Sequence, residues 1–162
     1  MRSKSWFQDC PVQLAAKSLL VGALVVGGLT LPTSFAFADT GVAWTKQVDK
    51  GLQQAKDEHK YVLADVYTDW CGWCKRLDQQ TFSNEGVSAF LAGKFVCIKV
   101  NAEDHGEGTK LAQKYKVDGF PCALVFDQQG KFIGKIVGFL PPEEYQAKVT
   151  QLIENPPAAP QM

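Results

Sequence analysis

The sequence lacks an excess of either charge. Its 162 residues include 17 Lys and Arg against 17 Asp and Glu, so the formal net charge is zero. This balance argues against nucleic-acid binding, which needs a basic face to neutralise phosphates. Apolar residues make up 46% of the chain, too many for a disordered, mucin-like or collagen-like protein. The length leaves room for one globular domain of about 100–150 residues with a hydrophobic core.

Cysteine is scarce as well. The chain has five, too few for a disulfide scaffold, and only two of them form a CxxC motif. A zinc site needs four ligands, typically a second CxxC or a histidine pair, which this sequence does not offer at a suitable spacing. Lys75 follows the motif where covalent haem attachment requires histidine. The five cysteines are Cys10, Cys71, Cys74, Cys97 and Cys122. We expect no metal and no cofactor.

The N-terminal apolar run is short for a membrane span. Leu19–Leu31 has 13 uncharged residues, against the about 20 that a spanning helix needs. Basic residues precede this run, and Ala36 and Ala38 follow it at the spacing that signal peptidase requires. This pattern predicts a secretory signal peptide over residues 1–38, cut after Ala38, with an uncleaved membrane anchor as the alternative. An exported chain would be periplasmic or otherwise extracytoplasmic, where its cysteines meet an oxidising compartment.

Helices and strands alternate over the remaining chain. Residues 39–154 predict one domain, and residues 155–162, rich in proline and alanine, predict a flexible tail. The sequence pattern indicates helices over 44–60, from the CxxC motif to about 81, over 83–91 with Ser83 as N-cap, over 109–117 and over 143–154. Strands are expected over 61–67, 95–100, 122–126 and 132–137. This order predicts an α/β fold in which helices flank a central mixed four-stranded sheet on both faces.

The CxxC motif lies between a predicted buried strand and a predicted helix. Cys71 falls at the N-terminus of that helix, where free N–H groups and the helix dipole favour a thiolate. Its pKa can therefore fall into the range of about 3.5–7.5 that reactive cysteines have. Cys74 lies one turn further on and can close a small disulfide with Cys71. The spacing predicts thiol–disulfide exchange, in which Cys71 attacks and Cys74 resolves; a purely structural disulfide is the alternative.

Features beyond the motif resemble the thioredoxin superfamily from about Trp44 to Ile153. The matching positions are Asp65 on the strand before the motif, Lys99 on the next strand, Pro121 in the loop Val117–Pro121, and Gly138 at the end of the last strand. More narrowly, Thr81–Val87 and Leu124–Gly130 resemble the C-terminal periplasmic domain of the membrane thiol–disulfide interchange reductase and its small secreted relatives. The resemblance implies a thioredoxin fold.

The resemblance also implies roles for individual residues. Asp65, if buried, would accept the proton of Cys74, and Lys99 would pair with Asp65 and tune it. The alternatives are a solvated carboxylate at a strand end and an ordinary surface lysine. A cis Pro121 would expose main-chain groups to an extended substrate. The substrate-binding surface would consist of Trp70, Gly72, Trp73, Phe120 and Pro121, although core packing is an alternative for the tryptophans, more for Trp70 than for Trp73.

Two features depart from the thioredoxin pattern or add to it. Gly72-Trp73 replaces the Gly-Pro of cytosolic thioredoxin, and the intervening dipeptide affects redox poise, so the direction of electron flow stays open. Cys97 and Cys122 are either two small buried apolar residues or, in an exported chain, a second disulfide or thiol pair.

The resemblance implies an exported thiol–disulfide oxidoreductase that reduces or exchanges disulfides in extracytoplasmic proteins. Its partners would be disulfide-bearing exported clients and a membrane thiol reductase as electron donor, and a single domain would act as a monomer. Two alternatives stay open: a net oxidant or isomerase, and a client-binding module in which redox chemistry is secondary. No nucleic acid is expected as a partner.

Overall fold

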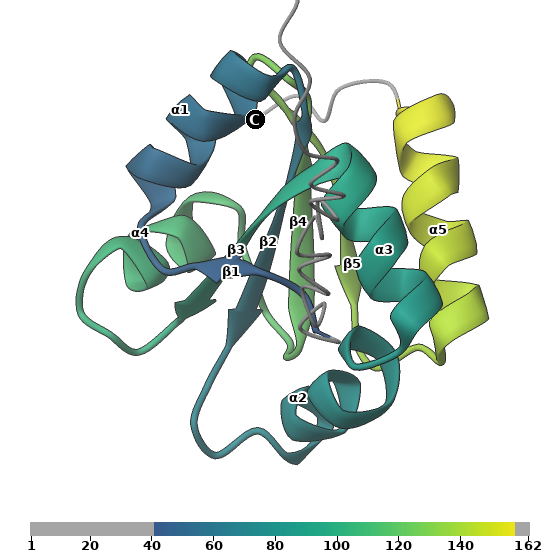
Figure 1. Cartoon of the computed structure of the whole chain (residues 1–162). Coiled ribbons are helices and arrows are strands. Elements are labelled where there is room, and N and C mark those ends of the chain that lie inside the picture. Colours follow the sequence, from purple (N-terminus) through teal and green to yellow (C-terminus); the bar gives the residue numbers. More distant parts are fainter. Residues whose placement is uncertain (1–40, 158–162) are drawn as a thin grey trace, which may run out of the picture. The chain divides into compact units, whose positions relative to one another are not determined.

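The computed structural model describes residues 41–157, in which helices surround a five-stranded sheet (Figure 1). The strands are β1 (Trp44–Thr45), β2 (Tyr61–Tyr67), β3 (Phe95–Asn101), β4 (Cys122–Phe126) and β5 (Phe132–Val137). The helices are α1 (Val48–Glu58), α2 (Gly72–Leu77), the short π-helical η1 (Asp78–Phe82), α3 (Glu85–Lys94), α4 (Glu107–Lys114) and α5 (Pro142–Glu154). The predicted signal peptide with its cleavage site after Ala38, and the last residues of the predicted tail, lie outside the described residues. Within the described range no helix is long and apolar enough to cross a membrane.

The sheet is mixed, with strand order β1-β3-β2-β4-β5. β1, β2 and β3 run parallel, while β4 is antiparallel to both β2 and β5. The side chains of β2 alternate between two apolar clusters, Leu63 in one and Val62 and Ala64 in the other, as a strand buried on both faces requires. α3 and α5 cover the first face and α1 and α4 the second (Figure 1). The predicted mixed sheet with helices on both faces is therefore confirmed.

The first two residues of one expected helix form a strand instead. Residues Trp44 and Thr45, predicted as the start of a helix, pair with Cys97 and Ile98 of β3, so the sheet has five strands rather than four. The Trp44 ring packs edge-on against Phe82, with ring centroids 4.9 Å apart, which holds this segment against the sheet. A two-residue strand has no alternation pattern that could reveal it.

Helix α1 begins at Val48 because a distant side chain completes its first turn. The Val48 N–H donates to a carboxylate oxygen of Glu107 over 2.8 Å, whereas the N-cap residue Gln47 makes no side-chain cap. A carboxylate at this position accepts a hydrogen bond from a free N–H and interacts favourably with the positive end of the helix dipole. The long-range contact thus ties α1 to the start of α4.

Two other helix starts differ from the prediction by one or two residues. The N-cap of α3 is Asn84 rather than Ser83: the Asn84 side chain accepts the Val87 N–H over 3.1 Å, while the Ser83 hydroxyl donates back to Gln79. α4 begins two residues earlier than expected, at Glu107. The Asp104 carboxylate accepts the N–H of Gly106 just before the helix and those of Gly108 and Thr109 in its first turn.

Candidate active site

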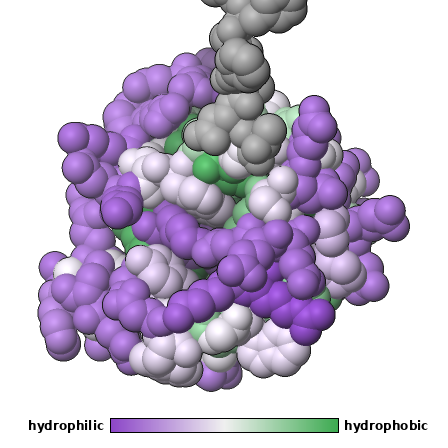
Figure 2. Space-filling view, turned by 60° about the horizontal axis from the view of Figure 1, so that its bottom comes forward, coloured by the Kyte–Doolittle hydropathy of each residue, from purple (hydrophilic) through white to green (hydrophobic). Residues whose placement is uncertain are grey.

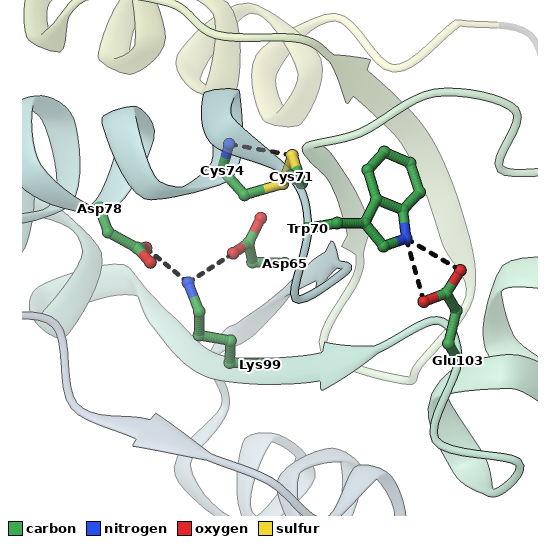
Figure 3. Close-up of a disulfide and its surroundings, with 7 residues drawn as sticks. All are labelled: Asp65, Trp70, Cys71, Cys74, Asp78, Lys99 and Glu103. Atoms are coloured by element: carbon green, nitrogen blue, oxygen red, sulfur yellow. Dashed lines mark hydrogen bonds and ion pairs between the residues drawn. A yellow bond between two sulfur atoms is a disulfide. The ribbon is translucent and has the colours of Figure 1, made fainter.

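Cys71 and Cys74 form a disulfide at the edge of the sheet where β2 ends. Their Cα atoms are 5.3 Å apart, and both residues are buried. Cys71 is the N-cap of α2, and its sulfur accepts the Cys74 N–H over 3.0 Å (Figure 3). A thiolate formed at Cys71 on reduction would therefore have an N–H donor already aimed at it, together with the positive end of the helix dipole.

The carboxyl group of Asp65 lies between this disulfide and the ammonium of Lys99 (Figure 3). Asp65 projects from β2 and is 1% exposed. One of its oxygens accepts from Lys99 over 2.8 Å, and the other, Oδ1, has no partner among the described residues. Burial raises the pKa of Asp65, and the opposing attraction of Lys99 does not cancel that effect. Asp65 is thus a buried carboxyl group, not a solvated strand end, with one oxygen free to exchange a proton.

Lys99 is held between two carboxylates rather than exposed as an ordinary surface lysine. Its ammonium lies 2.8 Å from Asp65 and 2.5 Å from Asp78, and the rings of Trp44 and Tyr67 lie within 5.3 Å of it. Burial lowers the pKa of Lys99, but the two carboxylates outweigh burial, so the net shift is upward. The Lys99 side chain therefore stays protonated, and its positive charge lies behind the disulfide.

Asp78 is the residue of this group that the sequence analysis missed. It begins η1, four residues after Cys74, and residues four apart share one face of a helix. That spacing is the signal that could have placed Asp78 beside the motif. Its side chain is 43% exposed, so it connects the buried Asp65–Lys99 pair with solvent.

Trp70 lies at the surface, contrary to the expectation that it would be the more buried of the two tryptophans. It is 68% exposed, against 56% for Trp73. The reason is its position in the loop after β2, beyond the edge of the sheet. Its indole N–H donates to both carboxylate oxygens of Glu103, each over 3.1 Å (Figure 3). The Trp70 ring also meets the ring of Phe120 edge-on, with centroids 6.0 Å apart. Glu103 was not anticipated, because nothing in its local sequence indicates a contact with the motif.

Trp73 lies in α2, the helix that runs away from the disulfide on the side opposite Trp70 (Figure 3). Its ring is tilted against Phe139, which follows β5, with centroids 6.0 Å apart. The guanidinium of Arg76 lies over both rings, 5.3 Å from the Trp73 centroid and 4.9 Å from that of Phe139. Gly72, between the cysteines, is exposed, and a Cβ there would meet no atom within 4 Å.

The expected cis peptide bond is present between Phe120 and Pro121. Pro121 directly precedes β4, whose first residue pairs with Val66 near the end of β2, so the proline lies at the same sheet edge as the motif. The Pro121 carbonyl accepts the Gly138 N–H over 2.8 Å and is therefore occupied. Among the described residues, no hydrogen bond uses the main chain of Phe120. The free main-chain groups at this edge thus belong to Phe120 rather than to Pro121.

Cys97 and Cys122 do not form a second disulfide. Both are free and buried, and they belong to the two different apolar clusters, on opposite faces of the sheet. β2 also separates their strands, so no rotation of their side chains could join them. Burial raises the pKa of Cys97 to about 12 and that of Cys122 to about 11. They are small buried apolar residues, which is the first of the two alternatives, and the second, a disulfide or thiol pair, does not hold.

A CxxC disulfide that caps a helix, with a buried carboxyl group behind it and a cis-proline at the same sheet edge, defines a thiol–disulfide oxidoreductase of the thioredoxin type. The comparison with known families agrees. The chain belongs to the thioredoxin-like domain family, whose model matches residues 48–153.

Relatives of known name point to the same group. The thiol:disulfide interchange protein DsbD of Yersinia pestis (strain Pestoides F) is 34% identical over 119 residues, which are 72% of this chain and 19% of that protein. The chain spans a quarter or less of the length of such curated relatives. A solution structure of a putative disulphide-isomerase from Bacteroides thetaiotaomicron has a TM-score of 0.64 and 32% identity, covering 71% of this chain and 95% of that one. The oxidised C-terminal domain of Neisseria meningitidis DsbD shares the fold, with a TM-score of 0.57 and 21% identity over 67% of this chain and 98% of that domain. The resemblance to the C-terminal domain of the interchange reductase is confirmed.

Proposed function

We propose that this chain is an exported oxidoreductase that uses Cys71 and Cys74 to reduce or exchange disulfides in extracytoplasmic proteins. The observation that carries the proposal is the Cys71–Cys74 disulfide with the buried carboxyl group of Asp65 behind it. Export rests on the sequence pattern of residues 1–38, with cleavage after Ala38.

The reaction begins with the reduced pair. The Cys71 thiolate attacks one sulfur of a client disulfide, which forms a mixed disulfide and releases the other client sulfur as a thiolate. The Cys74 thiol then gives its proton to Asp65 and attacks the Cys71 sulfur. This step re-forms the Cys71–Cys74 disulfide and expels the second client sulfur as a thiolate. Two electrons pass to the client, and both its thiolates take up protons from solvent.

Asp65 suits the second step because of its surroundings. Cys74 is buried, so its proton has to go to a group inside the protein. Asp65 has an unpartnered oxygen and a pKa raised by burial, which makes it a stronger base than an exposed carboxylate. Lys99 holds the carboxyl group in place and balances its charge once the proton leaves, and Asp78 in turn holds Lys99. We assign Lys99 and Asp78 as positioning residues.

The client would bind across the exposed surface around the disulfide. Trp70, Gly72, Trp73, Phe120 and Pro121 form this surface in the proposal. The free main chain of Phe120 would hydrogen-bond to an extended client segment, in the way that one strand adds to another. The partners are therefore disulfide-bearing exported proteins, bound by a monomer.

Each cycle leaves the protein oxidised, so a donor has to return two electrons. No cofactor is needed for this step, because a second dithiol can reduce the Cys71–Cys74 disulfide by the same exchange. In an extracytoplasmic compartment the donor would be a membrane thiol reductase.

The reduction potential of the Cys71–Cys74 pair tests the direction of flow. Equilibration with glutathione or dithiothreitol buffers, followed by thiol trapping, should give a value near −250 mV or below for a reductant. A value near −150 mV or above would instead identify an oxidant or isomerase. Cys71→Ser and Cys74→Ser variants test the chemistry itself: if both still support the cellular role, the protein is a client-binding module.

A further inference from the structure

Arg76 is an exposed cation with unused hydrogen-bonding capacity beside the disulfide. Its guanidinium is stacked over Trp73 and Phe139, and its Nε donates to Gln80 over 3.2 Å. Within residues 41–157 it forms no ion pair. The stack fixes one face of the guanidinium, while its terminal N–H groups stay available for a carboxylate.

The opposite charge lies on the Trp70 side. Glu103 is exposed and uses its carboxylate to hold the Trp70 indole N–H. Asp69, also exposed, accepts a hydrogen bond from Asn101 over 3.0 Å. Neither carboxylate forms an ion pair in the part of the chain that the structure describes. Two negative charges are therefore uncompensated on this side.

These charges lie beside two aromatic pairs on different sides of the disulfide. Trp70 precedes Cys71, contacts Phe120 and holds Glu103, and Figure 3 shows Trp70 and Glu103 together on one side of the disulfide. Trp73, which precedes Cys74, contacts Phe139 and Arg76, and both Trp73 and Arg76 belong to α2, which runs away from the disulfide on the other side. Figure 2, in which the end of the molecule that carries α2 is turned forward, shows mostly hydrophilic surface. An extended client chain rises about 3.3 Å per residue, so residues two or three positions before and after its reactive cysteine lie about 7–10 Å from it, on opposite sides.

We propose that Arg76 and Glu103 select the charge order of the client. The favoured client segment carries an acidic side chain on the Trp73 side of its reactive cysteine and a basic one on the Trp70 side. This inference rests on the proposed function, because it concerns the clients of the same disulfide. The physical reason is complementarity: the favoured order places each client charge against its opposite, and the reversed order places like charges together.

Two disulfide-bonded peptides of identical composition provide the test. One has Asp two residues before its cysteine and Lys two residues after, and the other has the two exchanged, so net charge cannot separate them. The reduced full-length chain should reduce one peptide about fivefold faster than the other at low salt, and the difference should shrink at high salt. The double variant Arg76→Glu/Glu103→Lys should reverse the order of the two rates. Arg76→Gln, a milder change, should reduce the ratio.

A matched control exchanges two exposed charges on α1, with Lys56→Glu/Asp57→Lys, and should keep the wild-type ratio. Equal rates for the two peptides with the wild type, or a preference that survives Arg76→Glu/Glu103→Lys, would overturn the inference. A neutral small disulfide, 2-hydroxyethyl disulfide, separates this failure from that of the proposed function. If the wild type reduces 2-hydroxyethyl disulfide but reduces the two peptides at equal rates, only the proposed charge selection is contradicted. A wild type that reduces none of the three substrates contradicts the proposed function, and the inference with it.

Discussion

Asp65 and Lys99 occupy paired positions on the neighbouring parallel strands β2 and β3, and their side chains meet at 2.8 Å. The register makes this contact: partners in adjacent strands project to the same face of the sheet. Here that face lies directly behind the disulfide (Figure 3). The pair thus places one buried acid and one cation where the chemistry of Cys74 would need them.

Asp65 should make stability depend on pH. Burial raises its folded-state pKa above the ordinary value, so the stabilisation from its protonated form is present below that ordinary value and is lost as pH rises through the raised one. The Asp65→Asn variant has no group that ionises at this position, so it does not lose stability in this way as pH rises. We expect its free energy of unfolding, relative to that of the oxidised wild type, to increase as pH rises above about 4, the ordinary pKa of a carboxyl group. Urea titrations across this range measure the gap, and a gap that narrows with pH would contradict the assignment.

The same variant should be slow in resolving mixed disulfides. Without a proton acceptor for Cys74, release of a trapped client from Cys71 should slow by about a hundredfold near neutral pH, the lower end of the range for general base catalysis. Rapid quenching of a preformed mixed disulfide measures this step separately from the first attack. Initial attack by Cys71 should change much less, which serves as the internal control.

Asp78 should adjust the pH at which resolution proceeds. Its negative charge raises the pKa of Asp65. Asp78→Asn removes that charge and leaves Lys99 to Asp65 alone, so the midpoint of the pH–rate profile for resolution should move to lower pH. Glu85→Gln, which removes an exposed carboxylate on α3, is the control and should leave the midpoint in place. A shift to higher pH would contradict this role for the Asp78 charge.

Gly108 should not tolerate a side chain. A Cβ there would clash with the main-chain oxygen of Asn101, and that oxygen belongs to β3 and cannot move alone. We expect Gly108→Ala to lower the free energy of unfolding by about 2–4 kcal/mol in denaturant titrations. Gly93→Ala, in α3, meets nothing within 4 Å and should be neutral or stabilise by up to about 1 kcal/mol. Equal effects of the two would show that the Asn101 contact is easily relieved.

The sequence predicted local features and missed those that depend on contacts between distant segments. The strands and the CxxC at a helix start follow from patterns within a few residues, and the match of Asp65, Lys99 and Pro121 to a known family added the buried pair. The contact between Trp70 and Glu103 joins two loops 33 residues apart, and the cap of α1 by Glu107 spans 59 residues. No local pattern carries such information, because the loops could have followed many courses.

The two spare cysteines illustrate the same limit. Alternation along β3 places Cys97 on the same face as Lys99, two residues on, so its side could have been derived. The face of Cys122 depends on how β4 pairs with β2, and that register, Cys122 opposite Val66, is a tertiary result. A second disulfide is excluded only when the faces of both Cys97 and Cys122 are known.

Cys97 and Cys122 should therefore stay unreactive in the folded, oxidised protein. Both thiols are buried and their pKa values lie near 12 and 11, so almost no thiolate forms at neutral pH. Alkylation with iodoacetamide followed by peptide mass spectrometry should find both unmodified, and fully modified after denaturation. Cys122→Ser, which buries a hydroxyl among apolar neighbours, should cost about 1–3 kcal/mol of stability, and Cys122→Ala markedly less. Rapid labelling of either thiol in the native state would mean that the sheet opens locally, since no other route leads to these residues.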